Sequence, residues 1–184
     1  MRESDAVLYA EVEGQGPRLV LVHGFAQNCR CWGPIAANLA TDHEVVRIDA
    51  PGHGRSTHRS AGLWTVAGLI ADVGGPATYL GYSMGARFVL HLLLAHPEQV
   101  RSAILVGGTA GVAEDEERRQ RAERDELMAQ ELEAEGIDEF LDSWFDQPLF
   151  AGLSEAMQFR AARGENTVEG LAASLRRAGT GAQD

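Results

Sequence analysis

Short apolar runs alternate with glycine-rich turns and with segments of helical spacing over the first 110 residues. Residues 8–12 alternate between apolar and polar side chains, as an exposed antiparallel strand does. Four later runs are mainly apolar, and the first two of them are typical of strands that are buried on both faces of a parallel sheet. These runs predict strands over residues 18–22, 44–48, 77–81 and 101–106.

Segments with helical spacing separate the predicted parallel strands. The spacing predicts helices over residues 31–39, 63–73 and 84–95, and Pro97 ends the last of them. Strands that alternate with helices in this way are typical of α/β proteins with a parallel sheet. The pattern therefore predicts an α/β fold with a doubly wound, mostly parallel sheet.

The pattern changes after Gly111, where no further strand is indicated. Helices are predicted over residues 114–135, 137–145, 154–163 and 168–177. We interpret this stretch as a helical cap over the sheet rather than a second domain with its own core. The chain then divides into the N-terminal part of an α/β core, residues 1–110, and a cap or lid region, residues 111–184.

Composition and charge narrow the possible partners. The chain has 184 residues, of which 45% are hydrophobic and 23% charged, which fits one globular domain and excludes a disordered chain. Its formal net charge of −11 repels nucleic-acid phosphates and anionic membranes, so we expect neither as a partner. All 16 of the lysine-plus-arginine residues are arginine, so any positive site must be built from guanidinium groups, whose planar shape suits carboxylates.

The cysteines and the first residues favour a reducing compartment. Cys29 and Cys31 are one residue apart, which is too close for an ordinary disulfide and is not the spacing of a zinc finger. No apolar run approaches the roughly 20 residues of a membrane helix, and the start lacks a secretory pattern. No dinucleotide-binding glycine motif follows a strand. We therefore expect a cytoplasmic protein without a metal or another cofactor.

Residues 81–85, Gly-Tyr-Ser-Met-Gly, match the G-x-S-x-G pattern of a nucleophile elbow. They join a predicted buried strand directly to an apolar helix, which is the context that this motif requires. Such a turn holds Ser83 in a strained conformation and exposes its hydroxyl at the N-terminus of the helix. The alternative is an ordinary turn between a strand and a helix.

Two more motifs follow the ends of predicted strands. His23-Gly24-Phe25 follows the strand over residues 18–22, and residues 49–56, with the sequence DAPGHGRS, follow the next strand. In this order the three motifs resemble the α/β-hydrolase superfamily over residues 18–110. The resemblance implies an oxyanion hole formed by the backbone N–H groups of Phe25 and Met84. We interpret His23 as a structural hydrogen-bonding residue rather than a base, and residues 49–56 as loop architecture beside the pocket.

The helical part makes the resemblance more specific. It is similar to the MenH-like family of 2-succinyl-6-hydroxy-2,4-cyclohexadiene-1-carboxylate synthases of menaquinone biosynthesis. This family eliminates pyruvate from a cyclohexene polycarboxylate, and the resemblance implies that Ser83, activated by a histidine, starts the proton abstraction. The similar segments are residues 81–87, 117–121 with Asp125, Phe140 with Trp144, 147–150, 171–176 and 179–183. The substrate-binding residues that the resemblance implies are Tyr82, Arg87, Arg121, Trp144 and Arg163.

Each of these substrate-binding assignments has a purely structural alternative. Arg87 would be a solvated helix residue, and Trp144 would be an anchor in the core of the cap. Arg121 would pair with Glu117, four positions earlier on the same helix, and Arg163 would lie on the surface.

The catalytic triad of this superfamily is incomplete in the chain. The triad runs in the order Ser, Asp or Glu, and then His. The histidines after Ser83 are His91 and His96, which lie about 12 and 20 Å further along the predicted helix, too far to act as its general base. The earlier histidines are in the wrong order. The sequence therefore predicts an N-terminal fragment of a longer enzyme, without the last strands that carry the triad Asp and His.

Three functions stay open on this pattern. The first is the MenH-like lyase, with a small-molecule carboxylate substrate and no activity expected from the 184 residues alone. The second is a small-molecule ester or lactone hydrolase of the same superfamily. The third is a non-catalytic pseudoenzyme that binds a carboxylate without converting it.

Overall fold

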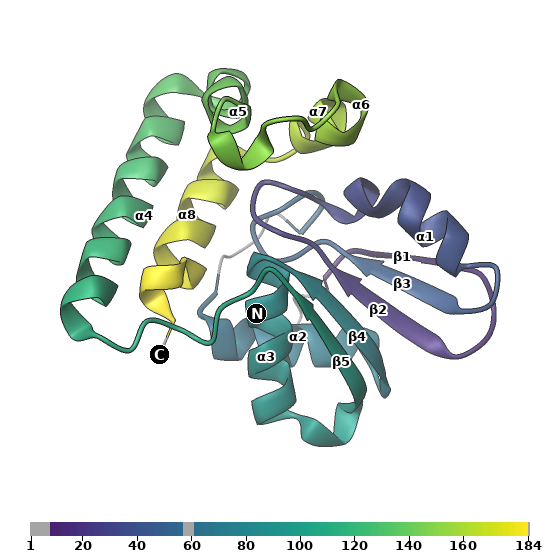
Figure 1. The fold of residues 1–184 in the computed structure, drawn as a ribbon. Helices are drawn as coiled ribbons and strands as arrows, with labels where there is room; N and C mark the ends of the chain where they lie inside the picture. The colour runs from purple at the N-terminus through teal and green to yellow at the C-terminus, as the bar shows by residue number, and fades with distance from the viewer. Residues whose placement is uncertain (1–7, 57–60, 184) are drawn as a thin grey trace, which may run out of the picture.

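The computed structural model describes residues 8–56 and 61–183, which form one sheet flanked by helices (Figure 1). The sheet has five strands in the order β1-β3-β2-β4-β5. β1 pairs antiparallel with β3, and the remaining pairs are parallel. The predicted α/β fold with a mostly parallel sheet is confirmed. The strands are β1 (Ala10–Glu13), β2 (Arg18–Val22), β3 (Glu44–Ile48), β4 (Ala77–Tyr82) and β5 (Val100–Val106).

Strand β2 lies at the centre of the sheet because both of its faces are apolar. Val20 pairs with Val46 of β3 on one side and with Tyr79 of β4 on the other, and all three side chains are fully buried. Residues of β2 that alternate with Val20 pack on the opposite face, against α1 (Gly33–Leu39). The helices α2 (Leu63–Gly74) and α3 (Met84–Ala95) cover the face to which Val20 points.

Two predicted helices differ from the structure. The helix expected over residues 31–39 begins with a 3-10 turn over Cys29–Trp32, and α1 follows it. The helix expected over residues 154–163 is divided into α6 (Glu155–Gln158) and α7 (Arg160–Arg163). Phe159 between them has a left-handed backbone with φ 51°, and the carbonyl of Gln158 accepts a hydrogen bond from Nε of Arg163, at 2.8 Å. Nη1 of Arg163 also donates to the carbonyl of Ala26, at 3.3 Å, and this long-range contact is not visible in the local pattern.

Residues 107–183 contain helices and loops without a strand. The helices α4 (Asp115–Glu135) and α8 (Val168–Ala178) lie side by side, and α5 (Ile137–Phe145) follows α4 (Figure 1). Arg176 of α8 joins them by ion pairs with Glu126 and Glu133 of α4. None of the helices in the described part of the chain is long and apolar enough to cross a membrane. The division into a core and a cap at residue 110 stays a prediction.

Candidate active site

Ser83 occupies a strained turn between β4 and α3. Its backbone angles are φ 54° and ψ −114°, and its N–H donates to the carbonyl of Val106, at 2.8 Å. Glycines are required on both sides of it, because a Cβ on Gly81 would lie 2.4 Å from the carbonyl oxygen of Gly85. A Cβ on Gly85 would lie 2.2 Å from the carbonyl oxygen of Val22. The turn therefore has the geometry of the predicted nucleophile elbow.

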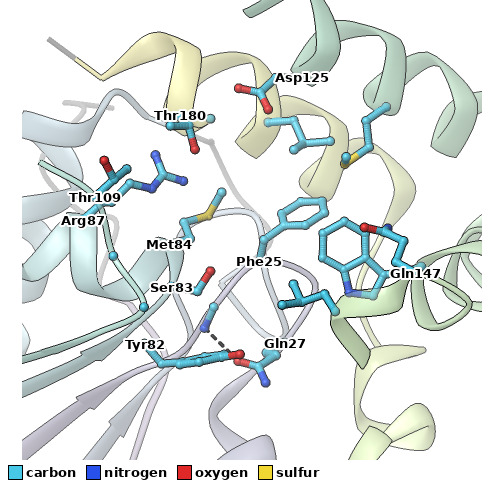
Figure 2. A pocket seen from close by; sticks show the side chains of 18 of the residues that line it. Phe25, Gln27, Tyr82, Ser83, Met84, Arg87, Thr109, Asp125, Gln147 and Thr180 are labelled. Atoms are coloured by element: carbon cyan, nitrogen blue, oxygen red, sulfur yellow. Dashed lines mark hydrogen bonds between the residues drawn. The ribbon is translucent and has the colours of Figure 1, made fainter. Parts of the chain in front are cut away.

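The loop after β2 lies directly against this turn. A Cβ on Gly24 would lie 3.2 Å from Cβ of Ser83, so a larger residue would be tightly packed against the turn. The N–H of Gly24 donates to Oε1 of Gln27, at 2.8 Å. Within residues 8–56 and 61–183, the N–H groups of Phe25 and Met84 donate no hydrogen bond. Figure 2 shows Phe25, Ser83 and Met84 around one space, and the role of the two amides as oxyanion donors stays a prediction.

Residues far along the chain hold this loop in place. The carbonyl of Ala26, which has a positive φ of 55°, accepts hydrogen bonds from Nδ2 of Asn166, at 3.2 Å, and from Nη1 of Arg163, at 3.3 Å. Oδ1 of Asn166 accepts from the N–H of Gly54, at 2.7 Å, and Nδ2 of Asn28 donates to the carbonyl of Ala162, at 2.6 Å. Sequence reasoning missed both asparagines, because nothing in their neighbours indicates a partner more than 100 residues away.

His23 is a structural residue, as expected. Its Nδ1 donates to the carbonyl of Gly24, at 2.8 Å, and its Nε2 accepts from the N–H of Ala50, at 3.0 Å, so the neutral ring is fully bonded. Burial lowers the pKa of His23 to about 4. In the loop over residues 49–56, the carboxylate of Asp49 accepts from the N–H groups of Cys29 and Arg55. None of these loop residues lines the cavity at Ser83, which agrees with an architectural role.

A cavity of about 420 Å³ opens beside Ser83, and we call it the Ser83 cavity. It is lined by the ends of β2, β4 and β5 and by residues of α4, α5 and α8. Figure 2 shows Arg87 and Thr109 on one side of it and Gln147 on the other. The structure brings all eight predicted site residues to this cavity, and their chemical roles stay predictions: Phe25, Tyr82, Ser83, Met84, Arg87, Arg121, Trp144 and Arg163. Lining residues that sequence reasoning missed include Gln27, Thr109, Arg124, Gln147 and Thr180.

Two of the predicted arginines are buried, which contradicts their structural alternatives. Arg87 is 5% exposed and Arg163 is 4% exposed, so Arg87 is not a solvated helix residue and Arg163 is not on the surface. Nη1 of Arg87 donates to the carbonyl of Ala178 at the end of α8, at 2.8 Å. Burial lowers the pKa of Arg87 to about 10 and also lowers the pKa of Arg163. Within the described residues, neither guanidinium forms an ion pair with a carboxylate.

Arg121 has a different partner from the one its helix spacing suggested. Its Nε bonds Oδ1 of Asp125, at 3.0 Å, and not the carboxylate of Glu117. Asp125 is 3% exposed and also accepts from the N–H of Gly181, at 3.0 Å, so the buried carboxylate is held from two sides. Arg124 lies on the exposed side of the same helix and completes the charged lining. The Ser83 cavity therefore has four arginines against the one carboxylate of Asp125.

Trp144 is part of an aromatic wall of the cavity. Its ring lies 5.6 Å from the rings of Phe25, Phe140 and Phe150 and is nearly parallel to that of Phe140. Trp144 thus anchors α5 on the loop after β2 and also faces the cavity. Its environment therefore agrees both with an anchor in the cap and with a residue at the substrate site.

Within the described part of the chain, no histidine lines the Ser83 cavity. Nδ1 of His91 donates to the carbonyl of Arg87, and its ring lies 4.7 Å from that of Trp64, on the side of α3 that faces α2. His58 lies outside the described residues. No group of three metal-ligating side chains is found among residues 8–56 and 61–183. The described site thus offers a serine, two amide donors and four arginines, but no imidazole.

The family is established by comparison with known proteins. The profile of the alpha/beta hydrolase fold family matches residues 17–159, and the chain belongs to this family. It is 33% identical, over 167 residues, to a 2-succinyl-6-hydroxy-2,4-cyclohexadiene-1-carboxylate synthase of Enterobacter sp. (strain 638). That match covers 86% of this chain and 64% of the relative, so the chain spans less than two thirds of the relative's length.

Two further proteins show the range of relatives. A pimeloyl-[acyl-carrier protein] methyl ester esterase of Xylella fastidiosa (strain M12) is 38% identical over 104 residues, which are 55% of this chain and 40% of the esterase. The solved structure of MenH from S. aureus superimposes with a TM-score of 0.85 at 26% identity and covers 96% of this chain and 73% of that one. The resemblance to MenH-like enzymes predicted from the motifs is confirmed.

Proposed function

We propose that this chain carries the nucleophile, oxyanion hole and substrate-binding arginines of a MenH-like lyase that eliminates pyruvate from a cyclohexene polycarboxylate. The main support is the Ser83 cavity, whose lining has four arginines and one carboxylate, although the chain as a whole has a net charge of −11. Such a local excess of positive charge favours a ligand with several negative charges. The similarity to the Enterobacter synthase supports the same substrate class.

The geometry suits a cyclic polycarboxylate. Arginine binds carboxylates through two parallel hydrogen bonds, and these are stronger in a partly buried site than in water. Arg87 and Arg163 are buried and have no carboxylate partner among the described residues, so a bound anion would supply their counter-charge. Trp144 offers an apolar surface for the ring of the substrate.

Ser83 would take part in proton transfer, while the N–H groups of Phe25 and Met84 stabilise negative charge on a substrate oxygen. A serine hydroxyl is a weak base at neutral pH unless an imidazole accepts its proton. Because the described residues bring no histidine to the cavity, we expect the 184-residue chain to bind the polycarboxylate and to turn it over poorly.

The binding experiment uses cis-cyclohex-4-ene-1,2-dicarboxylate as the probe, with titration calorimetry of the purified chain. Arg124 is the best position to change, because its side chain has no hydrogen bond within the described residues and its loss should not disturb the fold. Arg119 of the same helix lies outside the cavity and provides the matched control.

We expect Arg124→Gln to weaken binding of the dicarboxylate about 10-fold, because a charge-assisted hydrogen bond is lost. Arg119→Gln should bind within about 2-fold of the unmodified chain, as surface substitutions usually do. The dimethyl ester of the probe should not compete. Equal affinity of both variants, or equal binding of the neutral ester, would overturn the proposed substrate class.

A second candidate function is a hydrolase of small-molecule esters, which the similarity to the Xylella esterase favours. This function requires Ser83 but not Arg124. If it is right, Ser83→Ala abolishes turnover of p-nitrophenyl acetate, and Arg124→Gln leaves that turnover unchanged. Binding of the dicarboxylate without any Ser83-dependent reaction is expected both of the proposed lyase part and of the pseudoenzyme, because the described residues bring no histidine to the cavity. We also propose a cytoplasmic location, because both cysteines are buried free thiols.

A further inference from the structure

A second cavity, of about 510 Å³, adjoins the Ser83 cavity, and we call it the apolar cavity. It lies between the segment that contains α1 and the segment that contains α6 and α7. Ser83 does not line it, so it is a separate compartment beside the reacting atoms. The two cavities share a wall made by Gln27, Tyr82, Leu149, Phe150 and Arg163.

The remaining lining is almost entirely apolar. It comes from Cys31, Trp32, Ile35, Ala151, Gly152, Leu153, Met157 and Phe159. Several of these side chains are exposed although they are large and hydrophobic. Ile35 is 47% exposed and Met157 is 45% exposed, and Leu149 of the shared wall is 81% exposed. A ligand in this cavity would remove apolar surface from water, which is the main favourable contribution to binding.

Phe159 gives independent support for a binding role. Its backbone is left-handed, with φ 51° and ψ 38°, a conformation that costs a bulky residue energy. Such residues cluster at ligand sites, and Phe159 contributes to the lining of the apolar cavity. The turn that breaks the helix into α6 and α7 therefore also shapes this cavity.

Arg163 is the one charged residue in the described lining of the apolar cavity. Its Nε and Nη1 donate to the carbonyls of Gln158 and Ala26, while Nη2 has no hydrogen bond within residues 8–56 and 61–183. The guanidinium is buried without a carboxylate partner in that part of the chain. A cation at the inner wall of an apolar compartment is complementary to a ligand with one acidic head and an apolar body.

We propose that the apolar cavity binds the hydrocarbon part of an amphipathic monocarboxylate, an aryl- or alkyl-carboxylate whose acid group reaches Arg163. The volume of about 510 Å³ lies within the range of small-molecule binding sites. The proposal concerns a different compartment and a ligand with a single charge, but it shares Arg163 with the proposed function, so the two ligands would compete for this guanidinium.

Binding in each of the two cavities can be detected separately, because different methionines line them. Met84 and Met128 line the Ser83 cavity, and Met157 lines the apolar cavity. The chain is labelled with ¹³C-methyl methionine and titrated with 4-phenylbutanoate, with 4-phenylbutanamide as the neutral counterpart. We expect the Met157 signal to move with saturation while the Met84 and Met128 signals stay in place. The amide should bind at least about 10-fold more weakly, because it lacks the charge-assisted hydrogen bond to Arg163.

A pair of variants tests the site without disturbing Arg163. Ile35→Glu places a negative charge at the rim of the apolar cavity and should weaken 4-phenylbutanoate about 10-fold. Leu127→Glu introduces the same charge at a side chain that is 58% exposed and outside both cavities, and it should bind as the unmodified chain does.

Three results would overturn the proposal. The first is that 4-phenylbutanoate moves the Met84 and Met128 signals but not the Met157 signal. The second is that 4-phenylbutanoate and 4-phenylbutanamide bind equally well. The third is that the Met157 signal changes with protein concentration when no ligand is present. The last result would mean that a second copy of the chain occupies the cavity. Titration with cis-cyclohex-4-ene-1,2-dicarboxylate should move Met84 and Met128 instead of Met157, so failure of the proposed function is read from different signals.

Discussion

Asn166 should be one of the most sensitive polar positions outside the sheet. It is 5% exposed, and its amide makes three hydrogen bonds, to the N–H of Gly54 and to the carbonyls of Ala26 and Arg163. These bonds connect the loop after β3, the loop after β2 and the segment after α7. Replacement by alanine removes all three of these bonds, although the carbonyls of Ala26 and Arg163 each keep another donor.

The expected loss of unfolding free energy depends on which hydrogen bonds the neighbours of Asn166 keep. The carbonyl of Ala26 keeps its bond from Arg163, whereas the buried N–H of Gly54 loses its acceptor, Oδ1 of Asn166. A typical hydrogen bond contributes about 1 kcal/mol, and an unsatisfied buried donor costs about 1–3 kcal/mol. We therefore expect Asn166→Ala to reduce the free energy of unfolding by about 2–4 kcal/mol.

Urea unfolding at pH 7 provides the assay. With a slope of about 2 kcal/mol per molar urea, the midpoint of Asn166→Ala should fall by about 1–2 M at unchanged slope. Asn38→Ala is the matched control, because Asn38 is exposed on α1 and its side chain has no hydrogen bond among the described residues. A loss for Asn166→Ala that is as small as that of the control, within about 0.5 kcal/mol, would refute the assigned role.

Three further predictions use other parts of the structure. Gly85→Ala should destabilise the protein by at least about 1–3 kcal/mol, because its Cβ would overlap a carbonyl of β2, whereas Gly62→Ala, with no atom within 4 Å, should be nearly neutral in urea unfolding. Arg176→Gln should lower the melting temperature at pH 7. The difference in melting temperature between the variant and the unmodified chain should shrink as the pH falls from about 4.5 to about 2, because Arg176 lowers the pKa of Glu126 to about 2. A difference that stays constant over this pH range would contradict the prediction. His23 stays neutral in the folded protein down to about pH 4, so its contribution to stability is complete above pH 6.5 and declines between 6.5 and 4. A urea midpoint that is equal at pH 7 and pH 4.5 would contradict this.

Strands β2 and β3 could be predicted because their local apolar pattern indicates burial, whereas the apolar side chains of β5 are mostly exposed. The predicted bounds of β2 and β3, residues 18–22 and 44–48, match the structure, since their apolar runs are bounded by polar residues and turns. The break at Phe159 could not be predicted in this way. Residues 154–163 have helical composition, and the left-handed Phe159 lies in a segment that Arg163 joins to the distant carbonyl of Ala26.

The residues that line the Ser83 cavity were predicted better than the residues that support it. Motifs located Ser83 and Phe25, and the resemblance located the arginines of the cavity. Helix spacing alone could not decide whether Arg121 pairs with Glu117 or Asp125, since both are four positions away. Burial decides between the two partners, because the side chain of Asp125 is buried and its carboxylate also accepts a hydrogen bond from the N–H of Gly181.

The central claim is that the arginine-rich Ser83 cavity binds a cyclic polycarboxylate, and a crystal structure of the chain with cis-cyclohex-4-ene-1,2-dicarboxylate tests it most directly. We predict that the ring lies against Trp144, that at least one carboxylate is held by Arg87 or Arg163, and that the ligand is in contact with Ser83. A dicarboxylate bound elsewhere, or an empty cavity at a concentration that saturates the protein in solution, would contradict the account.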